Sequence, residues 1–309
     1  MEILITGGCG FIGTNLVNRM LQQPEIGRVR TLDNYVTGLR REVQSSRVQE
    51  IEGDLRNYDD VLRASDGVDA IVHLGALPSV PRSIKDPFST NAVNINGTLN
   101  VLEAARANNV GHVSVASSSS VYGANPTLPK VETLATLPLS PYAVTKLATE
   151  AYTNAYSTSY GLATVAFRFF NVFGPLQRAD HVYAAVIPKF LAALKADVPL
   201  TIFGDGEQSR DFTSIHAVTD ALTKSALRTV TNDTPVNLAF GTRTSLNTVV
   251  KLLQEMHPKK IRVEYVEQRP GDVSHSQASS TLLESILPDV DRPEFVQALR
   301  EVYDWYMGQ

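Results

Sequence analysis

The 309-residue sequence contains a single cysteine, Cys9, which excludes an internal disulfide framework and suits a reducing compartment. No uninterrupted apolar run reaches the length that spans a membrane. Because the chain starts with Glu2 instead of a basic stretch, we expect no signal peptide and a cytoplasmic location. Lys259-Lys260 is the only adjacent lysine pair, and the net charge of −4 gives no footprint for nucleic-acid binding.

The rest of the composition is ordinary for a soluble globular enzyme, with 43% hydrophobic and 19% charged residues. Strand and helix patterns alternate up to residue 170, which predicts an α/β fold with a Rossmann-type, doubly wound parallel sheet. Past residue 171 prolines interrupt the pattern, and helices are expected at 181–196, 215–229, 245–257 and 293–307. We therefore expect residues 1–170 to bind a dinucleotide, with later segments returning to the sheet. Residues 171–309 should form mainly a smaller substrate-binding lobe.

A predicted strand at residues 2–6 leads into a glycine-rich turn and an amphipathic helix. The turn reads Gly7-Gly8-Cys9-Gly10-Phe11-Ile12-Gly13. Strand, glycine turn and helix together are typical of a dinucleotide-binding loop, because glycines let backbone N–H groups approach a pyrophosphate. A second strand ends at Asp33, 20 residues after Gly13, as expected of the acid that binds the adenosine ribose. A carboxylate there repels a 2′-phosphate and favours NAD over NADP. The alternatives are a bare structural turn and an Asx turn at Asp33.

The stretch from Ser140 to Lys146 reads Ser-Pro-Tyr-Ala-Val-Thr-Lys and begins a predicted helix, with Pro141 at the first helical position. Tyr142 and Lys146 are four residues apart and so lie on one face of that helix. We expect the ammonium group of Lys146 to lower the pKa of the Tyr142 phenol, making it a general base near neutral pH. The alternative is a surface lysine beside a half-buried tyrosine.

Two further predicted strands end in residues that suit a ligand site. One strand, at 113–116, runs into four serines, which places hydroxyls where doubly wound sheets bind ligands. The other ends in His73 followed by Leu74-Gly75-Ala76, and small residues there leave room for a ligand. We interpret His73 as a satisfied strand-end histidine and not as a base. Asn94, in the next predicted helix, bridges strand ends or a ribose, or else lies on the helix surface.

Taken in order, these motifs resemble the extended short-chain dehydrogenase/reductases, and most closely their NAD-dependent nucleotide-sugar epimerase/dehydratase branch. The resemblance covers nearly the whole chain. The segments that carry it are Thr6–Gly13, Asp33-Asn34, His73–Ala76, Ser117–Gly123, Ser140–Lys146, Arg168–Pro175, Gly204–Phe212 and Arg269–Val273.

The resemblance implies a set of site residues and no metal ligand. The NAD-binding residues it implies are Gly7, Gly10, Phe11, Ile12, Gly13, Asp33, Asn34, Gly38, Asp54, Leu55, Leu74, Gly75, Ala76, Asn94, Ser117, Tyr142, Lys146 and Phe169. The catalytic residues are Ser118, Tyr142 and Lys146. The nucleotide-sugar is bound by Ser118, Ser119, Asn171, Arg210, Arg269, Asp272 and Ser276, with the two arginines facing the diphosphate.

The activity implied is 4-epimerisation of a UDP-hexose, UDP-Glc/UDP-Gal or UDP-GlcNAc/UDP-GalNAc, through a 4-keto intermediate in a homodimer that keeps its NAD. Tyr142 takes the proton of the sugar 4-hydroxyl, with Ser118 relaying or orienting it. Ser119 and Ser120 stand where dehydratases and decarboxylases of this branch carry carboxylates, which favours epimerisation. The open alternatives are a UDP-glucuronate 4-epimerase, a nucleotide-sugar dehydratase and a non-catalytic NAD-binding regulator.

Two positions bear on how this chain differs from its relatives. Ser276 matches the position at which the family selects sugars, and a small residue there resembles relatives that accept N-acetylated sugars. His216-Ala217 replaces the acidic pair that is usual after the Arg-Asp-Phe segment. Because of that replacement, we assign no contact at the start of this predicted helix to His216.

Overall fold

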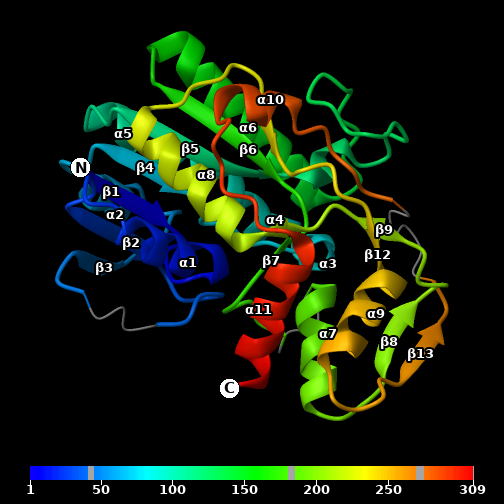
Figure 1. Cartoon of the computed structure of the whole chain (residues 1–309). Helices are drawn as coiled ribbons and strands as arrows, with labels where there is room; N and C mark the ends of the chain where they lie inside the picture. The colour runs from blue at the N-terminus through cyan, green and yellow to red at the C-terminus, as the bar shows by residue number, and fades with distance from the viewer. Residues whose placement is uncertain (41–44, 180–184, 269–274, 309) are drawn as a thin grey trace.

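The computed structural model describes residues 1–40, 45–179, 185–268 and 275–308. Within these ranges a central sheet of parallel strands has the order β11-β6-β5-β4-β1-β2-β3 (Figure 1). Its strands are β1 (Glu2–Thr6), β2 (Arg28–Asp33), β3 (Val48–Glu52), β4 (Ala70–His73), β5 (His112–Ser118), β6 (Thr164–Phe169) and β11 (Val236–Leu238). The predicted doubly wound α/β fold is confirmed.

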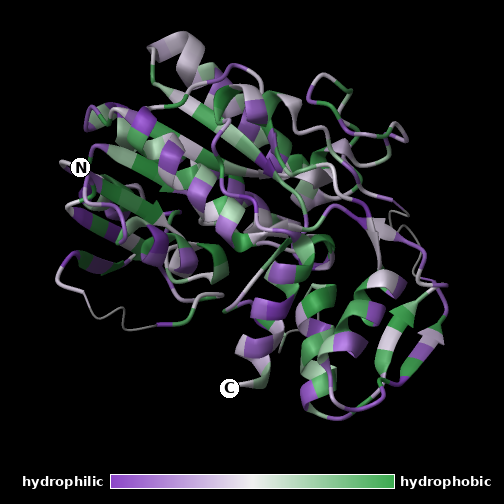
Figure 2. Ribbon diagram, viewed as in Figure 1, coloured by the Kyte–Doolittle hydropathy of each residue, from purple (hydrophilic) through white to green (hydrophobic). Residues whose placement is uncertain are grey.

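Helices cover both faces of this sheet. One face carries α2 (Tyr58–Ala64), α5 (Gly97–Ala107) and α6 (Pro141–Tyr160), and the other carries α1 (Phe11–Met20), α8 (Ile215–Arg228) and α10 (Thr281–Ile286). Strand β1 shows why both faces are buried. Ile3 and Ile5 belong to the core beneath α1 and α8, whereas Leu4 belongs to the core beneath α2 and α5. Strands β1 and β4 are accordingly hydrophobic along most of their length, whereas the edge strand β3 carries polar residues and is partly purple in Figure 2.

Segments from late in the chain complete the core of the sheet. Strand β11 pairs with β6, and α8 packs against α1. Leu222 of α8, Leu238 of β11 and Leu283 of α10 are all buried in the same cluster as Ile3. Later segments thus contribute side chains to the core of the sheet, and one of their helices, α10, was not among those that the sequence pattern predicted.

A second, smaller core lies beside the sheet, at the lower right of Figure 1. It gathers the helices α7 (Val186–Lys195), α9 (Leu246–Met256) and α11 (Phe295–Met307) around the parallel pair β8 (Leu200–Phe203) and β13 (Val263–Val266). Together with α8, these helices lie where the sequence predicted helices, apart from residues 181–184, which fall outside the described ranges. Phe173, Phe212 and Phe295 pack their rings together, with centroid separations of 5.4 to 6.1 Å.

Short elements link the sheet to the smaller core and carry several predicted site residues. These elements are α3 (Val80–Lys85), α4 (Pro87–Asn91), the π-helical turn η1 (Ala92–Asn96), the 3₁₀ turn η2 (Ser119–Tyr122), β7 (Val172–Phe173), β9 (Ser209–Arg210), β10 (Thr213–Ser214) and β12 (Thr244–Ser245). Strand β7 pairs with β10, and β9 pairs with β12. Among the helices that the structure describes, none has the length and apolar composition that crossing a membrane requires.

Candidate active site

A cavity of about 660 Å³ opens at the carboxyl ends of β1 and β4, where the strand order reverses. Doubly wound sheets bind their ligands at this switch point. Every predicted cofactor-binding residue lines the cavity except Gly38 and Asn94. Tyr142 and Lys146 of the predicted catalytic set line the same cavity, whereas Ser118, the third member, does not.

The glycine turn has the shape that a bound pyrophosphate needs. Gly7 has φ +69°, and a Cβ there would lie 2.8 Å from the Cα of Gly75. A Cβ on Gly13 would lie 2.3 Å from the carbonyl oxygen of Gly7. No side chain caps the start of α1 at Gly10, so the first-turn N–H groups keep their capacity to bind an anion. These positions need glycine because a Cβ would collide with neighbouring backbone, and the resulting tight turn leaves its N–H groups accessible, which fits a dinucleotide.

Two carboxylates, Asp33 and Asp54, line the cavity where the sequence predicts the adenosine. Asp33 accepts the N–H of Cys9 at 3.0 Å and that of Tyr35 at 2.9 Å, so the Asx turn considered for Asp33 exists and the side chain still lines the cavity. Gly38 packs against this carboxylate, since a Cβ there would lie 3.1 Å from Asp33 Oδ2. The guanidinium of Arg56, bonded to both oxygens of Asp54, holds the pKa of that carboxyl far below its usual range.

The start of α6 is capped twice, which fixes the position of Tyr142, the predicted general base. Ser140 accepts the N–H of Ala143 at 3.2 Å, and Pro141 stands at the first helical position as predicted. Ser83, from α3, accepts the N–H of Tyr142 at 3.0 Å. Both capping oxygens satisfy donors that a helix start otherwise leaves open.

The three predicted catalytic side chains converge. Ser118 lies close enough to Tyr142 to act on its phenol, and Lys146 Nζ donates to the carbonyl oxygen of Ala116 at 2.7 Å. Burial raises the pKa of Tyr142, while the neighbouring Ser118 hydroxyl lowers it. The expected lowering by Lys146 is therefore corrected, because desolvation dominates at the phenol and the ammonium group is directed at Ala116. Burial also lowers the pKa of Lys146 to about 8, and Glu150 opposes that shift.

His73 is a satisfied core histidine, as the sequence predicted. Its Nδ1 lies 2.7 Å from Thr6 Oγ1, and its Nε2 lies 3.0 Å from Thr98 Oγ1. Thr98 donates its own proton to the carbonyl oxygen of Asn94 at 2.6 Å, so the network assigns the hydrogen to His73 Nε2. Burial and the charge of Lys146 lower the pKa of His73 to about 3, which keeps the ring neutral.

Asn94 is buried inside the π-helical turn η1 and does not line the cavity. Its Oδ1 accepts the N–H of Leu77 at 2.7 Å, and its Nδ2 donates to Thr145 Oγ1 at 3.0 Å. The side chain thus joins the loop after β4 to α6. Of the alternatives drawn from the sequence, the structure supports the bridge at the strand end, and the surface position is wrong.

Four side-chain polar atoms of the described residues are buried without a partner, Thr31 Oγ1, His112 Nδ1, Ser120 Oγ and Gln177 Oε1, and the sequence analysis did not single out Gln177. Gln177 lines the cavity, while its Nε2 donates to the carbonyl oxygen of Val172 at 3.0 Å. Ser120 lies in η2 beside Ser119, and the N–H of Ser120 donates to Ser118 Oγ at 3.2 Å. Buried polar atoms are rarely left unpaired in proteins, so Ser120 Oγ and Gln177 Oε1 suit a polar ligand. A lone Gln in an irregular segment gives no sequence signal of this.

The predicted substrate residues of the smaller lobe gather around β9. Asn171 Nδ2 donates to the carbonyl oxygen of Asp211 at 3.2 Å. The N–H of Ser276 donates to the carbonyl oxygen of Ser209 at 3.0 Å. Arg210 lies between these two contact points on β9. Arg269 and Asp272 lie outside the described residues.

His216 makes the contact that the sequence left unassigned. It follows Ser214, whose Oγ caps α8 by accepting the N–H of His216 at 3.2 Å. Its Nε2 lies 2.7 Å from Glu301 Oε2 on α11. The departure from the acidic pair thus joins α8 to the last helix. Among the described residues no group of three or more His, Cys, Asp or Glu side chains is placed to hold a metal ion.

Comparison with known proteins shows which family and which solved structures the chain is similar to. The family profile described as "NAD dependent epimerase/dehydratase family" matches residues 3–239. A UDP-glucose 4-epimerase of Mycolicibacterium smegmatis is 33% identical over 293 residues, which covers 93% of this chain and 92% of the relative.

Solved structures agree over the whole chain. A UDP-N-acetylglucosamine 4-epimerase from Methanobrevibacter ruminantium, in complex with UDP-N-acetylmuramic acid, superposes with a TM-score of 0.93 at 36% identity, covering 99% of this chain and 98% of that one. A UDP-glucuronic acid 4-epimerase from Bacillus cereus, in complex with UDP-glucuronic acid and NAD, superposes with a TM-score of 0.89 at 30% identity, covering 100% and 99%.

Proposed function

This chain belongs to the NAD-dependent epimerase/dehydratase family, and we propose that it is an NAD-dependent 4-epimerase that interconverts UDP-GlcNAc and UDP-GalNAc alongside UDP-Glc and UDP-Gal. The observation that carries the proposal is the convergence of Ser118, Tyr142 and Lys146 beside the glycine turn. The N-acetylated substrates are favoured by the small side chain of Ser276 and by the similarity to a UDP-N-acetylglucosamine 4-epimerase.

NAD fits the cavity through the glycine turn, Asp33 and the strand-end residues Leu74–Ala76, and when bound it supplies the redox chemistry. The protein's own residues handle the proton and the orientation of the sugar. Tyr142 takes the proton from the sugar 4-hydroxyl as general base, and the neighbouring Ser118 hydroxyl stabilises the phenolate against the cost of burial. Lys146, anchored on Ala116, holds positive charge one helical turn away.

The serines that follow β5 distinguish epimerisation from the rival reactions of this family. Elimination of water and decarboxylation both need a carboxylate or carboxylic acid near the sugar. Ser119 and Ser120 occupy η2, beside Ser118, and a hydroxyl cannot serve as a carboxylate base. The unpaired Ser120 Oγ suits a hydrogen bond to a substituent of the sugar.

The test is incubation of the purified protein with UDP-Glc, UDP-GlcNAc and UDP-GlcA, with products resolved by NMR at C4. We expect inversion at C4 of UDP-GlcNAc and UDP-Glc. Tyr142→Phe should lower kcat by roughly 10²- to 10⁴-fold while the fold and bound NAD remain, because only the proton-accepting oxygen is lost. Turnover confined to UDP-GlcA would contradict the proposed substrates. A Tyr142→Phe protein with near-normal kcat would contradict the proposed base.

We also propose that two copies associate in the cytoplasm through the face formed by α3, α4 and α6. These helices pack against one another and expose several apolar side chains to solvent. Phe88 is 88% exposed and Ile84 is 65% exposed, with Val144 beside them on α6. A second copy covering this face would remove that apolar surface from water.

A further inference from the structure

Three consecutive residues at the end of β5 face α6, and two of them are hydrogen-bonded to it. The pairs are the carbonyl oxygen of Ala116 with Lys146 Nζ at 2.7 Å, Ser117 Oγ with Glu150 Oε1 at 2.5 Å, and the Ser118 hydroxyl with the phenol of Tyr142, whose pKa it lowers. The outer two pairs contain the proposed catalytic residues. The middle pair contains Glu150, one helical turn beyond Lys146, for which the proposed chemistry has no use.

Glu150 is also half of a buried ion pair with Arg168 of β6. The guanidinium donates from Nε to Oε1 and from Nη2 to Oε2, both at 2.8 Å, and each side chain is 4% exposed. Arg168 Nη1 donates further to the Tyr122 hydroxyl at 2.9 Å. Tyr122 ends η2, the turn that Ser118 caps. The ion pair therefore holds α6 on one side and the far end of the serine segment on the other.

A buried ion pair is a poor device for stability, because desolvation of both charges offsets most of their attraction. The position of the Glu150–Arg168 pair, beside the proposed catalytic residues, indicates a role other than stability. The charged and titratable groups that face Glu150 are Arg168 from β6 and Lys146 from α6. The groups that face Lys146 are Glu150, Tyr142 on its own helix and the neutral His73 from β4. Glu150 is thus the negative charge set against the buried ammonium.

We propose that Glu150 and Arg168 are positioning residues that hold Tyr142 and Lys146 in register with Ser118, and that Glu150 supplies the counter-charge of the Lys146 ammonium. The proposal rests on the proposed function, since it concerns the same catalytic residues. Neither side chain lines the cavity, so neither is expected to touch substrate or NAD.

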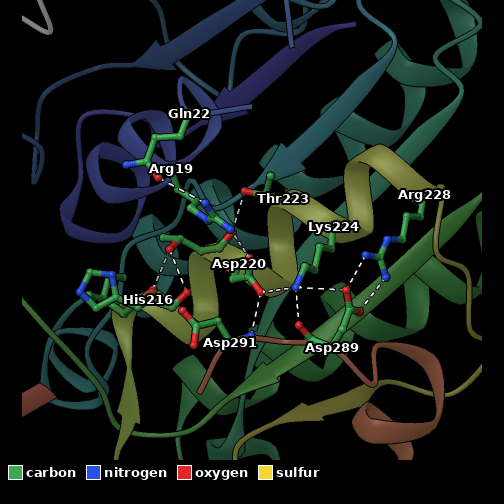
Figure 3. Close-up of polar contacts among 11 residues, drawn as sticks. Arg19, Gln22, His216, Asp220, Thr223, Lys224, Arg228, Asp289 and Asp291 are labelled. Carbon is green, nitrogen blue, oxygen red and sulfur yellow. Dashed lines mark hydrogen bonds and ion pairs between the residues drawn. The ribbon is translucent and has the colours of Figure 1, made fainter. Parts of the chain in front are cut away.

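A second buried carboxylate provides a matched control away from the cavity. Asp220 of α8 has a side chain only 2% exposed, and it binds Arg19 at 2.6 Å and Lys224 at 2.8 Å (Figure 3). It also accepts the N–H of Asp291 at 2.8 Å. Asp220 therefore shares with Glu150 its burial, a guanidinium and a lysine, but none of these partners belongs to the site.

The first experiment compares Glu150→Gln with Asp220→Asn and the wild type. We expect Glu150→Gln to lower kcat by about 10- to 100-fold, with KM and NAD content unchanged, because the catalytic groups lose their register. The alkaline limb of the pH profile of kcat/KM should move to lower pH, because Lys146 loses the carboxylate that raises its pKa. Asp220→Asn should lower the melting temperature and leave kcat at the wild-type value. Equal kcat losses in the two variants would overturn the proposal.

A double variant separates positioning from stability. Glu150→Met/Arg168→Met removes both charges of the ion pair, so neither member is left buried without the other, and the variant should recover most of the melting temperature. We expect kcat to stay low and the alkaline limb to stay displaced in this variant. Recovery of kcat together with the melting temperature would show that the pair is only structural and would overturn the proposal.

A further measurement distinguishes failure of this proposal from failure of the proposed function. Wild-type protein that converts none of the UDP-sugars would refute the proposed function alone. The role of Glu150 would then be read from the pKa of Lys146 by NMR of protein carrying isotopically labelled lysine, with no substrate present. We expect Glu150→Gln to lower that pKa. An unchanged pKa would overturn the counter-charge role.

Discussion

At the scale of single residues, the spacing of Tyr142 and Lys146 was enough to predict a shared helix face and a shared site. It was not enough to predict what each side chain bonds to. Lys146 is directed at the carbonyl oxygen of Ala116, and Glu150 pairs with a residue 18 positions along the chain. Such partners are set by tertiary packing, and so are the pKa values that follow from burial.

His73→Gln should make the protein less sensitive to acid. The folded-state pKa of His73 is about 3, below its value of 6.5 in the unfolded chain, so only the unfolded state gains this proton between those pH values. The free energy of unfolding therefore decreases as pH falls from 6.5 toward 3, with a slope of up to ~1.4 kcal/mol per pH unit from this residue. Urea unfolding across this range should show a flatter slope in the variant. If the variant showed the same slope as the wild type, other titratable groups would be responsible for the loss of stability in acid.

At the scale of elements, the sequence predicted where α6 begins, because Ser140 and Pro141 are local signals. The second cap was not predictable. Ser83 lies 59 residues before Tyr142, and its contact with the start of α6 exists only because α3 packs against that helix. In the same way, η1 is a π-helical turn that periodicity reads as ordinary helix, and this turn is what carries Asn94 to Leu77 and Thr145.

Ser83→Ala should lower the free energy of unfolding by ~1 kcal/mol, because the buried N–H of Tyr142 loses its acceptor. Because that N–H belongs to the catalytic tyrosine, kcat should fall more than KM changes. Chemical unfolding and steady-state kinetics measure the two effects. Ser285→Ala is the control, since the exposed Ser285 hydroxyl contacts only its own helix, and its removal should change neither quantity. A Ser83→Ala protein that matched this control would show the second cap to be dispensable.

At the scale of the whole molecule, the alternation of patterns predicted the parallel sheet, and the later helices were placed close to their observed bounds. The boundary at residue 170 stays a prediction. Sequence patterns could not show how many residues from the later segments are buried in the core of the central sheet. Leu222, Leu238 and Leu283 reach that core from three separate elements. Side chains from distant segments meet only through the topology of the fold.

Phe88→Asp should convert the proposed dimer into a monomer. Phe88 is 88% exposed in the single chain, and an aspartate at that place would put a charge into an apolar contact between two copies. Sedimentation velocity measures the oligomeric state. Val198→Asp, at a 50% exposed position in the smaller core's part of the chain, should leave that state unchanged. Monomeric wild-type protein, or a dimer that survives Phe88→Asp, would contradict the proposed face.

The edge strand β11 has a consequence for synthesis on the ribosome. It is bonded only to β6 within the sheet, and it leaves the ribosome some seventy residues after its neighbour. Until then the nascent polypeptide carries an open β6 edge and, before α8 emerges, a bare apolar surface over β1 and β4. During translation the protein therefore passes through a stage at which its exposed apolar surface and unpaired strand edge favour aggregation. A chaperone that covers strand edges would shorten this stage.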